Sequence, residues 1–240
     1  MRLIEASVIL PCRNEDQNII RTLEMLKRIN NLSFETIVVV DSKEDSTIKA
    51  IKLLKIRLPK LKVLVQPYGA GAANAIRYGI ERSNSDCVVV MMADGSDDTR
   101  SIIDLVNLVN RGVVVACASR YMSGGMQIGG PKFKKFLSKT AGKILYMFAG
   151  VRTHDPTNSF KAYSKQFINK VGIQSNSGFE IGIELVAKAH RYRLPIAEIP
   201  TIWLDRTVGK SNFILTKLIP KYFVWFRYCF KPKKHIGALQ

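Results

Sequence analysis

The sequence predicts a single α/β domain with a mostly parallel central sheet, followed by a C-terminal amphipathic helical segment. Short runs of β-branched residues recur in the first half of the chain and alternate with longer stretches of helical apolar spacing. The chain has 240 residues, of which 47% are hydrophobic, enough to bury one substantial core. No repeat or low-complexity linker divides it, so we expect one main domain over residues 1–212 and an appendage over residues 213–240.

Each expected element rests on its own pattern. The expected strands are residues 7–10, 35–40, 62–65, 86–93 and 113–118, and the helices between them are residues 15–29, 46–57, 70–82 and 101–111. Asp45 or Ser46 can cap the second helix, and Asp98 or Thr99 the fourth. Beyond residue 125 the pattern is less regular, and it predicts helices at residues 131–151 and 177–190 and a strand at residues 196–203.

Polar segments follow each of the five strands. Because ligands of an open parallel sheet bind at the carboxyl ends of the strands, these segments are the first places to look for a site. They are residues 11–15, 41–45, 66–71, 94–98 and 119–125. Each is polar, charged or glycine-containing, which is typical of a nucleotide crevice.

Composition limits the partners. The 37 Lys and Arg against 19 Asp and Glu give a formal charge of +18, which predicts attraction to polyanions without choosing among phospholipid, nucleic acid and sugar phosphate. The four cysteines form no CxxC pair and indicate reduced core residues. The apolar stretch at the N-terminus is too short for a secretory signal, and no segment has the roughly 18 apolar residues that cross a bilayer.

An acidic cluster ends the central strand, with the sequence Asp94-Gly95-Ser96-Asp97-Asp98. Carboxylates at a strand end can bind Mg²⁺ or Mn²⁺ while diphosphate oxygens and water complete the coordination shell. The alternative is a helix N-terminus that favours acidic residues. Asp41 and Asp45 likewise fit either ligands or turn residues.

In this order the loops resemble those of the family-2 glycosyltransferases of the GT-A fold, and within them the dolichol-phosphate mannose synthase-like branch. Residues 11–15 (PCRNE) are similar to the family's P-x-x-N-E, and residues 40–47 (VDSKEDST) to its D-D-x-S-x-D-x-T loop. Residues 69–79 are similar to its G-x-G-x-A-x-x-x-G helix start, and Ala93-Asp94 falls on its DXD metal motif. Further similarities lie at residues 118–125, 155–163, 178–184, 198–200 and 205–211.

The resemblance implies a metal-dependent transferase that moves a sugar from a GDP- or UDP-sugar, with inversion, to a polyprenyl phosphate such as dolichyl or undecaprenyl phosphate. The implied catalytic residues are Asp94, Arg120 and Arg206, and the implied metal site, for Mg²⁺ or Mn²⁺, is Asp94, Ser96 and Asp97. The implied nucleotide-binding residues are Pro11, Arg13, Glu15, Asp41, Gly71 and Ala93, and the substrate-binding residues are Asp155, Ser159, Glu184, Lys210 and Ser211.

Two positions depart from the family pattern. Val40 replaces the first Asp of the nucleotide loop, and Met92 replaces the first Asp of the DXD motif. Neither side chain can ligate a hard cation. Metal binding then depends on Asp94, assisted by Ser96 or Asp97, and base recognition on Asp41 or Glu15. An inactive relative is the alternative that these departures leave open.

Two basic, aromatic segments predict docking on an anionic membrane surface. Residues 131–151 interleave five lysines with aromatic residues, and residues 213–230 are rich in Phe, Tyr and Trp and are followed by Lys231, Lys233 and Lys234. We therefore expect a cytoplasmic protein, peripheral on the inner face of the cytoplasmic membrane. The alternative is that both helices pack on the core and present lysines to water.

Other functions make different predictions. A transferase with a soluble or polysaccharide acceptor would use the same donor chemistry but leave its product in water. A nucleic-acid-binding protein would fit the charge, but no RNP, helix-turn-helix or zinc-finger signature is present, so we expect no nucleic acid partner. A nucleotidyltransferase would need a glycine-rich loop after the first strand, where residues 11–15 contain no glycine.

Overall fold

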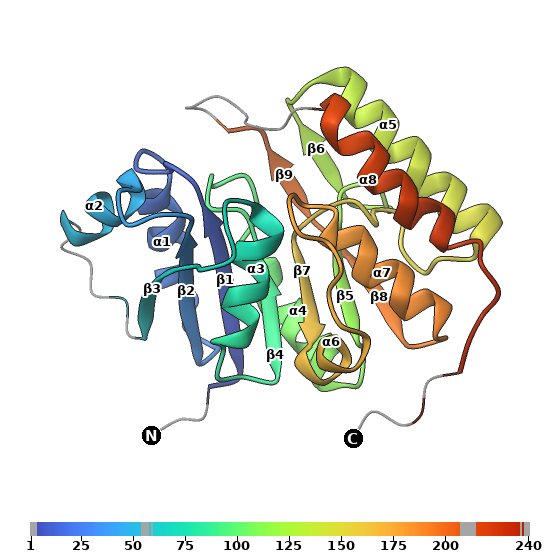
Figure 1. Ribbon diagram of the computed structural model, residues 1–240, viewed down its shortest axis with the longest axis horizontal. Coiled ribbons are helices and arrows are strands. Elements are labelled where there is room, and N and C mark those ends of the chain that lie inside the picture. Colours follow the sequence, from blue (N-terminus) through green and yellow to red (C-terminus); the bar gives the residue numbers. More distant parts are fainter. Residues whose placement is uncertain (1–3, 54–57, 59, 207–214, 236, 238–240) are drawn as a thin grey trace.

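The computed structural model describes residues 4–53, 58, 60–206, 215–235 and 237. A seven-stranded sheet with order β3-β2-β1-β4-β7-β5-β8 forms its centre (Figure 1). In chain order the strands are β1 (Ala6–Cys12), β2 (Phe34–Val40), β3 (Leu61–Val65), β4 (Cys87–Val90), β5 (Val115–Ser119), β7 (Lys161–Ser164) and β8 (Ile196–Pro200). All pairs are parallel except those of β7, which is antiparallel to both β4 and β5. This confirms the α/β class and the mostly parallel sheet.

Helices cover both faces of this sheet, as Figure 1 shows with α3 and α7 in front and the fainter α1 and α4 behind. They are α1 (Ile19–Lys27), α2 (Ser46–Leu53), α3 (Ala72–Glu81), α4 (Ser101–Asn110), α5 (Lys132–Ile144), α6 (Lys165–Val171), α7 (Ile181–Arg191) and α8 (Leu215–Tyr228). A π-helical turn, η1 (Leu145–Ala149), continues α5. A separate two-stranded parallel sheet joins β6 (Met126–Ile128) to β9 (Ile202–Leu204).

The two faces of the sheet have separate apolar cores. Strand β1 is buried along its whole length, and its side chains alternate between them, with Ile9 in one core and Val8 and Leu10 in the other. The first core is closed by α3, α6, α7 and α8, and the second by α1, α2 and α4. Because both faces are covered, the exposed edge of the sheet at the carboxyl ends of its strands is the place left for a ligand.

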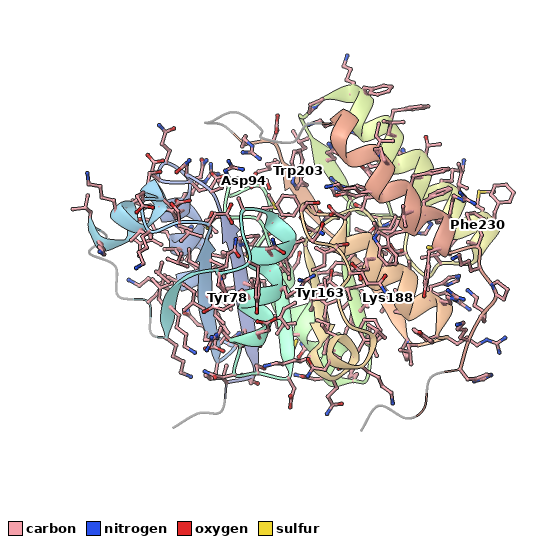
Figure 2. The ribbon with its side chains drawn as sticks, in the orientation of Figure 1. Tyr78, Asp94, Tyr163, Lys188, Trp203 and Phe230 are labelled. Carbon is pink, nitrogen blue, oxygen red and sulfur yellow. The ribbon has the colours of Figure 1, made fainter. Side chains whose placement is uncertain are left out.

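The C-terminal segment packs on the domain through its last helix. Trp225 of α8, together with Cys229 just beyond it, belongs to the same core as α7, and Lys188 of α7 lies 5.3 Å from the Trp225 ring (Figure 2 labels Lys188). All four cysteines are buried and free, which confirms the expectation of reduced core residues.

Candidate active site

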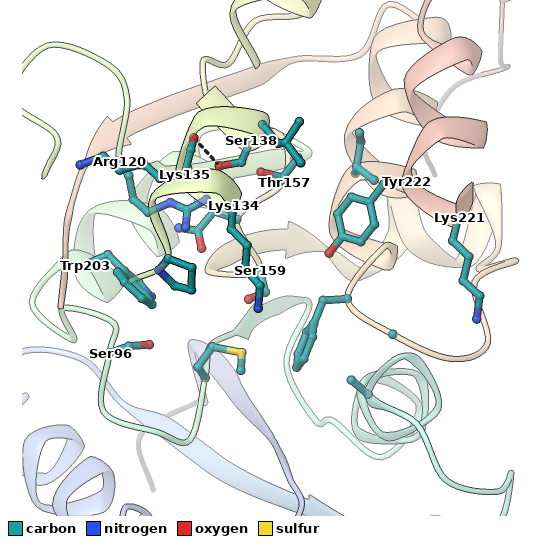
Figure 3. Close-up of a pocket in the computed structure, with 18 of the residues that line it drawn as sticks. Ser96, Arg120, Lys134, Lys135, Ser138, Thr157, Ser159, Trp203, Lys221 and Tyr222 are labelled. Carbon is teal, nitrogen blue, oxygen red and sulfur yellow. Dashed lines mark hydrogen bonds between the residues drawn. The ribbon is translucent and has the colours of Figure 1, made fainter. Parts of the chain in front are cut away.

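A single cavity of about 810 Å³ extends from the carboxyl ends of the strands to the space between α5 and α8 (Figure 3). Ten residues with an expected role line it: Pro11, Arg13, Glu15, Asp41, Gly71, Asp94, Ser96, Arg120, Ser159 and Arg206. Segments that are far apart in the sequence therefore meet at one place, as the topology of the sheet requires.

The loop after β1 is held by the start of α2. The Asp45 carboxylate accepts hydrogen bonds from the backbone N–H of Asn14 at 3.1 Å and of Thr47 at 2.9 Å, and the Thr47 hydroxyl accepts one from the N–H of Glu15 at 3.0 Å. Asn14 has a φ of 54°, a left-handed conformation that Asn tolerates better than most residues. Asp45 thus caps α2 as expected, and the same contacts fix the backbone next to Glu15.

The second loop places Asp41 beside the start of α3. One Asp41 carboxylate oxygen accepts hydrogen bonds from the Gln66 side-chain amide at 2.9 Å and from the Gly71 N–H at 3.3 Å. A Cβ on Gly71 would lie 2.6 Å from the Ser177 carbonyl oxygen, and Gly71 also has a φ of 152°. Glycine is therefore required here, because the backbone before α3 passes close to the loop before α7.

The third loop follows β4 and carries Asp94, which Figure 2 labels at the upper edge of the sheet. Asp94 is 5% exposed; one oxygen accepts the Ser96 N–H at 3.0 Å and the other lies 2.8 Å from a guanidinium nitrogen of Arg206. A second Arg206 nitrogen lies 3.7 Å from Glu15. Burial raises the pKa of Glu15, and the Asp94 charge adds to this rise while Asn18 and Arg206 oppose it.

The residues beside Asp94 fit a small divalent cation. Among the described residues, the Ser96 hydroxyl and one Asp97 carboxylate oxygen are buried and have no hydrogen-bond partner, which a bound cation would explain. Burial raises the pKa of Asp97 to about 7. Within the described part of the chain, no three His, Cys, Asp or Glu residues come together as a metal-binding group. A cation would therefore take the Asp94 carboxylate and the Ser96 hydroxyl, and its other ligands from diphosphate and water.

Arg120 follows β5 and is held by a buried carboxylate. Its Nε lies 2.7 Å and its Nη2 3.0 Å from the two oxygens of Asp155, a bidentate pair. Burial alone would lower the pKa of Arg120, but Asp155 raises it above its usual range. The guanidinium therefore stays charged at the cavity wall in one orientation.

Four expected site residues do not line the cavity, namely Ala93, Asp97, Asp155 and Glu184. Glu184 is fully buried and accepts hydrogen bonds from the backbone N–H groups of Gln174 and Ser175 and from the Lys188 ammonium. Its carboxylate thus holds residues 174–175 against α7.

The other three are also turned inward. Asp155 is fully buried and bonds to three residues that line the cavity, Arg120, Thr157 and Asn158. Asp97 is also buried, and one of its oxygens accepts the Met92 N–H at 2.8 Å. Ala93 is buried, and its carbonyl accepts the Thr22 hydroxyl. The two remaining expected residues, Lys210 and Ser211, lie outside the described residues.

The cavity also gathers cations that we did not expect there. Lys134 and Lys135 of α5 line it, together with Ser138, and Figure 3 shows them on the side opposite Tyr222 and Lys221 of α8. Burial lowers the pKa of Lys134, and the nearby charge of Arg206 lowers it further. The sequence signal was present, since both lysines belong to the basic amphipathic stretch interpreted above as a membrane surface.

The part of the cavity between α5 and α8 is apolar. Its wall consists of aliphatic and aromatic side chains from both helices and from the start of α7. These are Phe136, Leu137, Ala141 and Ile144 of α5, Ile219, Phe223 and Phe226 of α8, and Phe179 and Ile183 near the start of α7. One cavity thus has a charged end at the sheet and an apolar end between two helices.

A doubly wound sheet with a carboxylate, a buried hydroxyl and several cations at the ends of its strands is typical of enzymes that act on nucleotide-linked substrates. The family model for glycosyl transferase family 2 matches residues 7–172, and the chain belongs to that family. This confirms the resemblance found in the loop motifs.

Curated relatives are similar along most of the chain. A dolichol-phosphate mannosyltransferase of Pyrococcus furiosus is 30% identical over 98% of this chain and 66% of its own length. A polyprenol monophosphomannose synthase of Mycolicibacterium smegmatis is 27% identical over 85% of this chain and 79% of its own length. The chain thus spans about two thirds of the first relative.

Solved structures of the same fold include glucosyl-3-phosphoglycerate synthase of Mycobacterium tuberculosis, in complex with Mn²⁺, uridine diphosphate and glucosyl-3-phosphoglycerate. It has a TM-score of 0.66 and 18% identity, and it covers 97% of this chain and 82% of its own. This likeness supports the GT-A fold.

Proposed function

We propose that the protein transfers a sugar from a nucleotide-diphosphate sugar to a polyprenyl phosphate, with inversion at the anomeric carbon. The observation that carries the proposal is the continuity of the cavity, which joins a charged end suited to a diphosphate to an apolar groove suited to a lipid chain. The names of the two curated relatives, both acting on a polyprenol or dolichol phosphate, support the same acceptor class.

The donor would bind at the charged end. Pro11, Arg13, Glu15, Asp41 and Gly71 line the part of the cavity next to β1 and β2, where the base and ribose of the nucleotide are expected. Asp41 uses one oxygen for Gln66 and Gly71, so its second oxygen can accept a hydrogen bond from the base. Asp94 and Ser96 would hold Mg²⁺ or Mn²⁺, which neutralises charge on the diphosphate when bound.

The cations of the cavity would stabilise the charge that moves during the reaction. Cleavage of the sugar–phosphate bond leaves negative charge on the diphosphate, and Arg206 and Arg120 are placed on the cavity wall to bind it. Lys134 and Lys135 lie on the α5 side, where an acceptor phosphate would enter from the apolar groove. A phosphate monoester with a second ionisation near pH 6 is already an anion at neutral pH, so the chain needs no strong base to activate it.

The face that carries the groove opening would dock on an anionic membrane. Phe133 and Phe136 of α5 and Phe223 and Val224 of α8 are exposed, and lysines accompany both helices. Within the part of the chain that the structure describes, every helix is too short or too polar to cross a membrane. We therefore propose peripheral binding on the cytoplasmic side, with the segment from residue 213 onward as part of the docking surface.

A transfer assay tests the proposal. Purified protein with Mg²⁺ or Mn²⁺ is incubated with labelled GDP- and UDP-sugars and a polyprenyl phosphate, and label is measured in the organic phase. We expect transfer from one donor. Label that moves only to a water-soluble acceptor would reassign the acceptor, and no turnover with any donor would overturn the proposal.

Two variants separate the ends of the cavity. Asp94→Asn removes the charged ligand that would hold the cation and is expected to lower metal-dependent donor binding by at least tenfold, a change of about 1.4 kcal/mol. Ala141→Phe fills the apolar groove and is expected to reduce transfer to polyprenyl phosphate while donor binding is unchanged. Equal effects of both variants on donor binding would contradict the division of the cavity.

A further inference from the structure

A second pocket, of about 470 Å³, lies apart from the active-site cavity and shares no lining residue with it. Its polar lining consists of Arg152, His190, Arg193 and Lys233, and its remaining wall of Gly150, Leu194, Pro195 and Ile196. Three chain segments meet there, namely the end of η1, the end of α7 and the tail that follows α8, which Figure 1 shows descending past α7.

The walls of this basic pocket are fixed by contacts between the tail and α7. The backbone N–H of Lys234 donates to the Arg191 carbonyl at 2.8 Å, and Arg191 Nε donates to the Pro232 carbonyl at 3.2 Å. His190 is 8% exposed and bonds to the Lys233 ammonium. The pocket is therefore a built feature of the fold.

The charges in the basic pocket exceed what the fold needs. Helix C-termini attract cations, which accounts for Lys233 at the end of α7. Arg152 and Arg193 add two further cations, and their side chains make no ion pair or hydrogen bond within the described residues. Burial lowers the pKa of Lys233, and the Arg193 charge lowers it further, so like charges face one another across the pocket. An anion between them would relieve this repulsion.

Exposed apolar side chains lie close in the sequence to residues that line the basic pocket. Phe148 of η1, two residues before Gly150, is 73% exposed, and its neighbour Met147 is also exposed. Phe230 lies exposed three residues before Lys233, at the edge of the molecule in Figure 2. Exposed aromatics beside a basic pocket are typical of a membrane interface, where rings enter the acyl region and cations remain at the phosphates.

We propose that the basic pocket binds the phosphate of an anionic phospholipid headgroup, as a second lipid contact on the face that docks to the membrane. The guanidinium groups of Arg152 and Arg193 can each form paired hydrogen bonds to phosphate oxygens, and Lys233 adds a point charge. Bound there, the headgroup fixes how α5 and α8, and hence the mouth of the active-site groove, are oriented on the bilayer. This inference rests on the membrane docking proposed above.

Vesicle sedimentation with the full chain tests the proposal. Neutral phosphatidylcholine vesicles receive equal negative charge either as phosphatidic acid, which presents a phosphate, or as a fatty acid, which presents a carboxylate. Wild-type protein and the double variant Arg152→Gln/Arg193→Gln are compared on both. A matched control, Lys139→Gln/Lys143→Gln, removes two exposed cations of α5 that lie outside both pockets.

The pocket variant is expected to lose about tenfold more affinity for phosphatidic acid vesicles than for carboxylate vesicles, because paired phosphate hydrogen bonds are lost as well as charge. The control is expected to lose equally on both. Equal losses of affinity by the two double variants on both kinds of vesicle would overturn the proposal. Binding of inorganic phosphate at Arg152 and Arg193 that leaves vesicle binding unchanged would also overturn it.

Sugar transfer to a polyprenyl phosphate in detergent separates this inference from the proposed function. The pocket variant is expected to keep wild-type transfer there, and its circular dichroism reports whether it is folded. Absence of transfer by the wild-type protein would refute the proposed function. Equal losses of the pocket variant on phosphatidic acid and carboxylate vesicles, with transfer intact, would refute only the basic pocket.

Discussion

Gly142 is the position at which a single methyl group should most clearly disturb the active-site groove. It lies in α5 and is buried against the backbone of residues 154–156, close to the loop that carries Asp155. A Cβ at Gly142 would be 2.0 Å from the His154 carbonyl oxygen and 3.3 Å from Pro156 Cδ. The near obstacle is backbone, so no side-chain rotation can relieve the clash.

The size of the effect follows from two opposing contributions. Replacing glycine by alanine inside a helix favours folding by about 1 kcal/mol. To restore a normal contact, α5 must move by about 1 Å, and because backbone is displaced the cost of overpacking should lie at the upper end of its usual range, about 3 kcal/mol. We expect Gly142→Ala to destabilise the protein by about 2 kcal/mol, which lowers Tm by roughly 4–8 °C in a chain of this size.

Gly182 in α7 provides a matched control, because a Cβ there would lie 3.3 Å from the Asn158 carbonyl oxygen, a tight contact that needs only a small adjustment. Gly182→Ala should therefore keep or slightly raise the stability measured by thermal and urea unfolding. Gly142→Ala should also reduce transfer to polyprenyl phosphate more than donor binding, since α5 lines the acceptor end of the cavity. A Gly142→Ala protein as stable as wild type, with Gly182→Ala less stable, would refute this reasoning.

Two further predictions concern buried charge. The pKa of His190 is lowered to about 4 by burial and by Lys233, so between pH 6.5 and 4 the unfolded chain binds a proton that the folded chain does not, and stability falls as the pH drops through this window. Urea unfolding should show that the free energy of unfolding of the wild-type protein falls by about 2 kcal/mol from this group between pH 7 and pH 4.5, and that the fall is smaller in His190→Gln. An equal fall in the two proteins would contradict this prediction. Lys188→Met leaves the Glu184 carboxylate buried without its cation and should lower the free energy of unfolding by about 3–5 kcal/mol. Adding Glu184→Gln to this variant should recover part of the loss. A Lys188→Met protein as stable as wild type would contradict the buried ion pair.

The parallel part of the sheet was predictable because its strands are continuous β-branched runs, as buried strands require. Strand β7 was not predicted. It has the sequence KAYS, and its fully buried Lys161 looks like a surface residue until the carbonyls of Pro156 and Asn158, which accept its hydrogen bonds, are known. The strand is defined by its pairing with β4 and β5, which lie far from it in the sequence, and such long-range pairing leaves no trace in local periodicity.

The donor end of the site was also predictable, since each strand end must point to the same edge of the sheet. Which carboxylates face the cavity was not. Asp94 lines it, whereas Glu184 turns inward to backbone N–H groups, and the two look alike as isolated acidic residues in a sequence. Likewise, the lysines of α5 were assigned to a membrane surface. The sequence alone does not show that Lys134 and Lys135 line the active-site cavity.

The position of β7 also affects how the chain reaches its native state. This strand lies between β4 and β5, although it follows both in the sequence. During synthesis, the two neighbours leave the ribosome first, and each presents an open edge until residues 161–164 arrive to bridge them. The first half can collapse early around its own parallel strands, but the two halves of the crevice are joined only when this late insertion occurs. We therefore expect assembly to be slow and sensitive to edge-to-edge association.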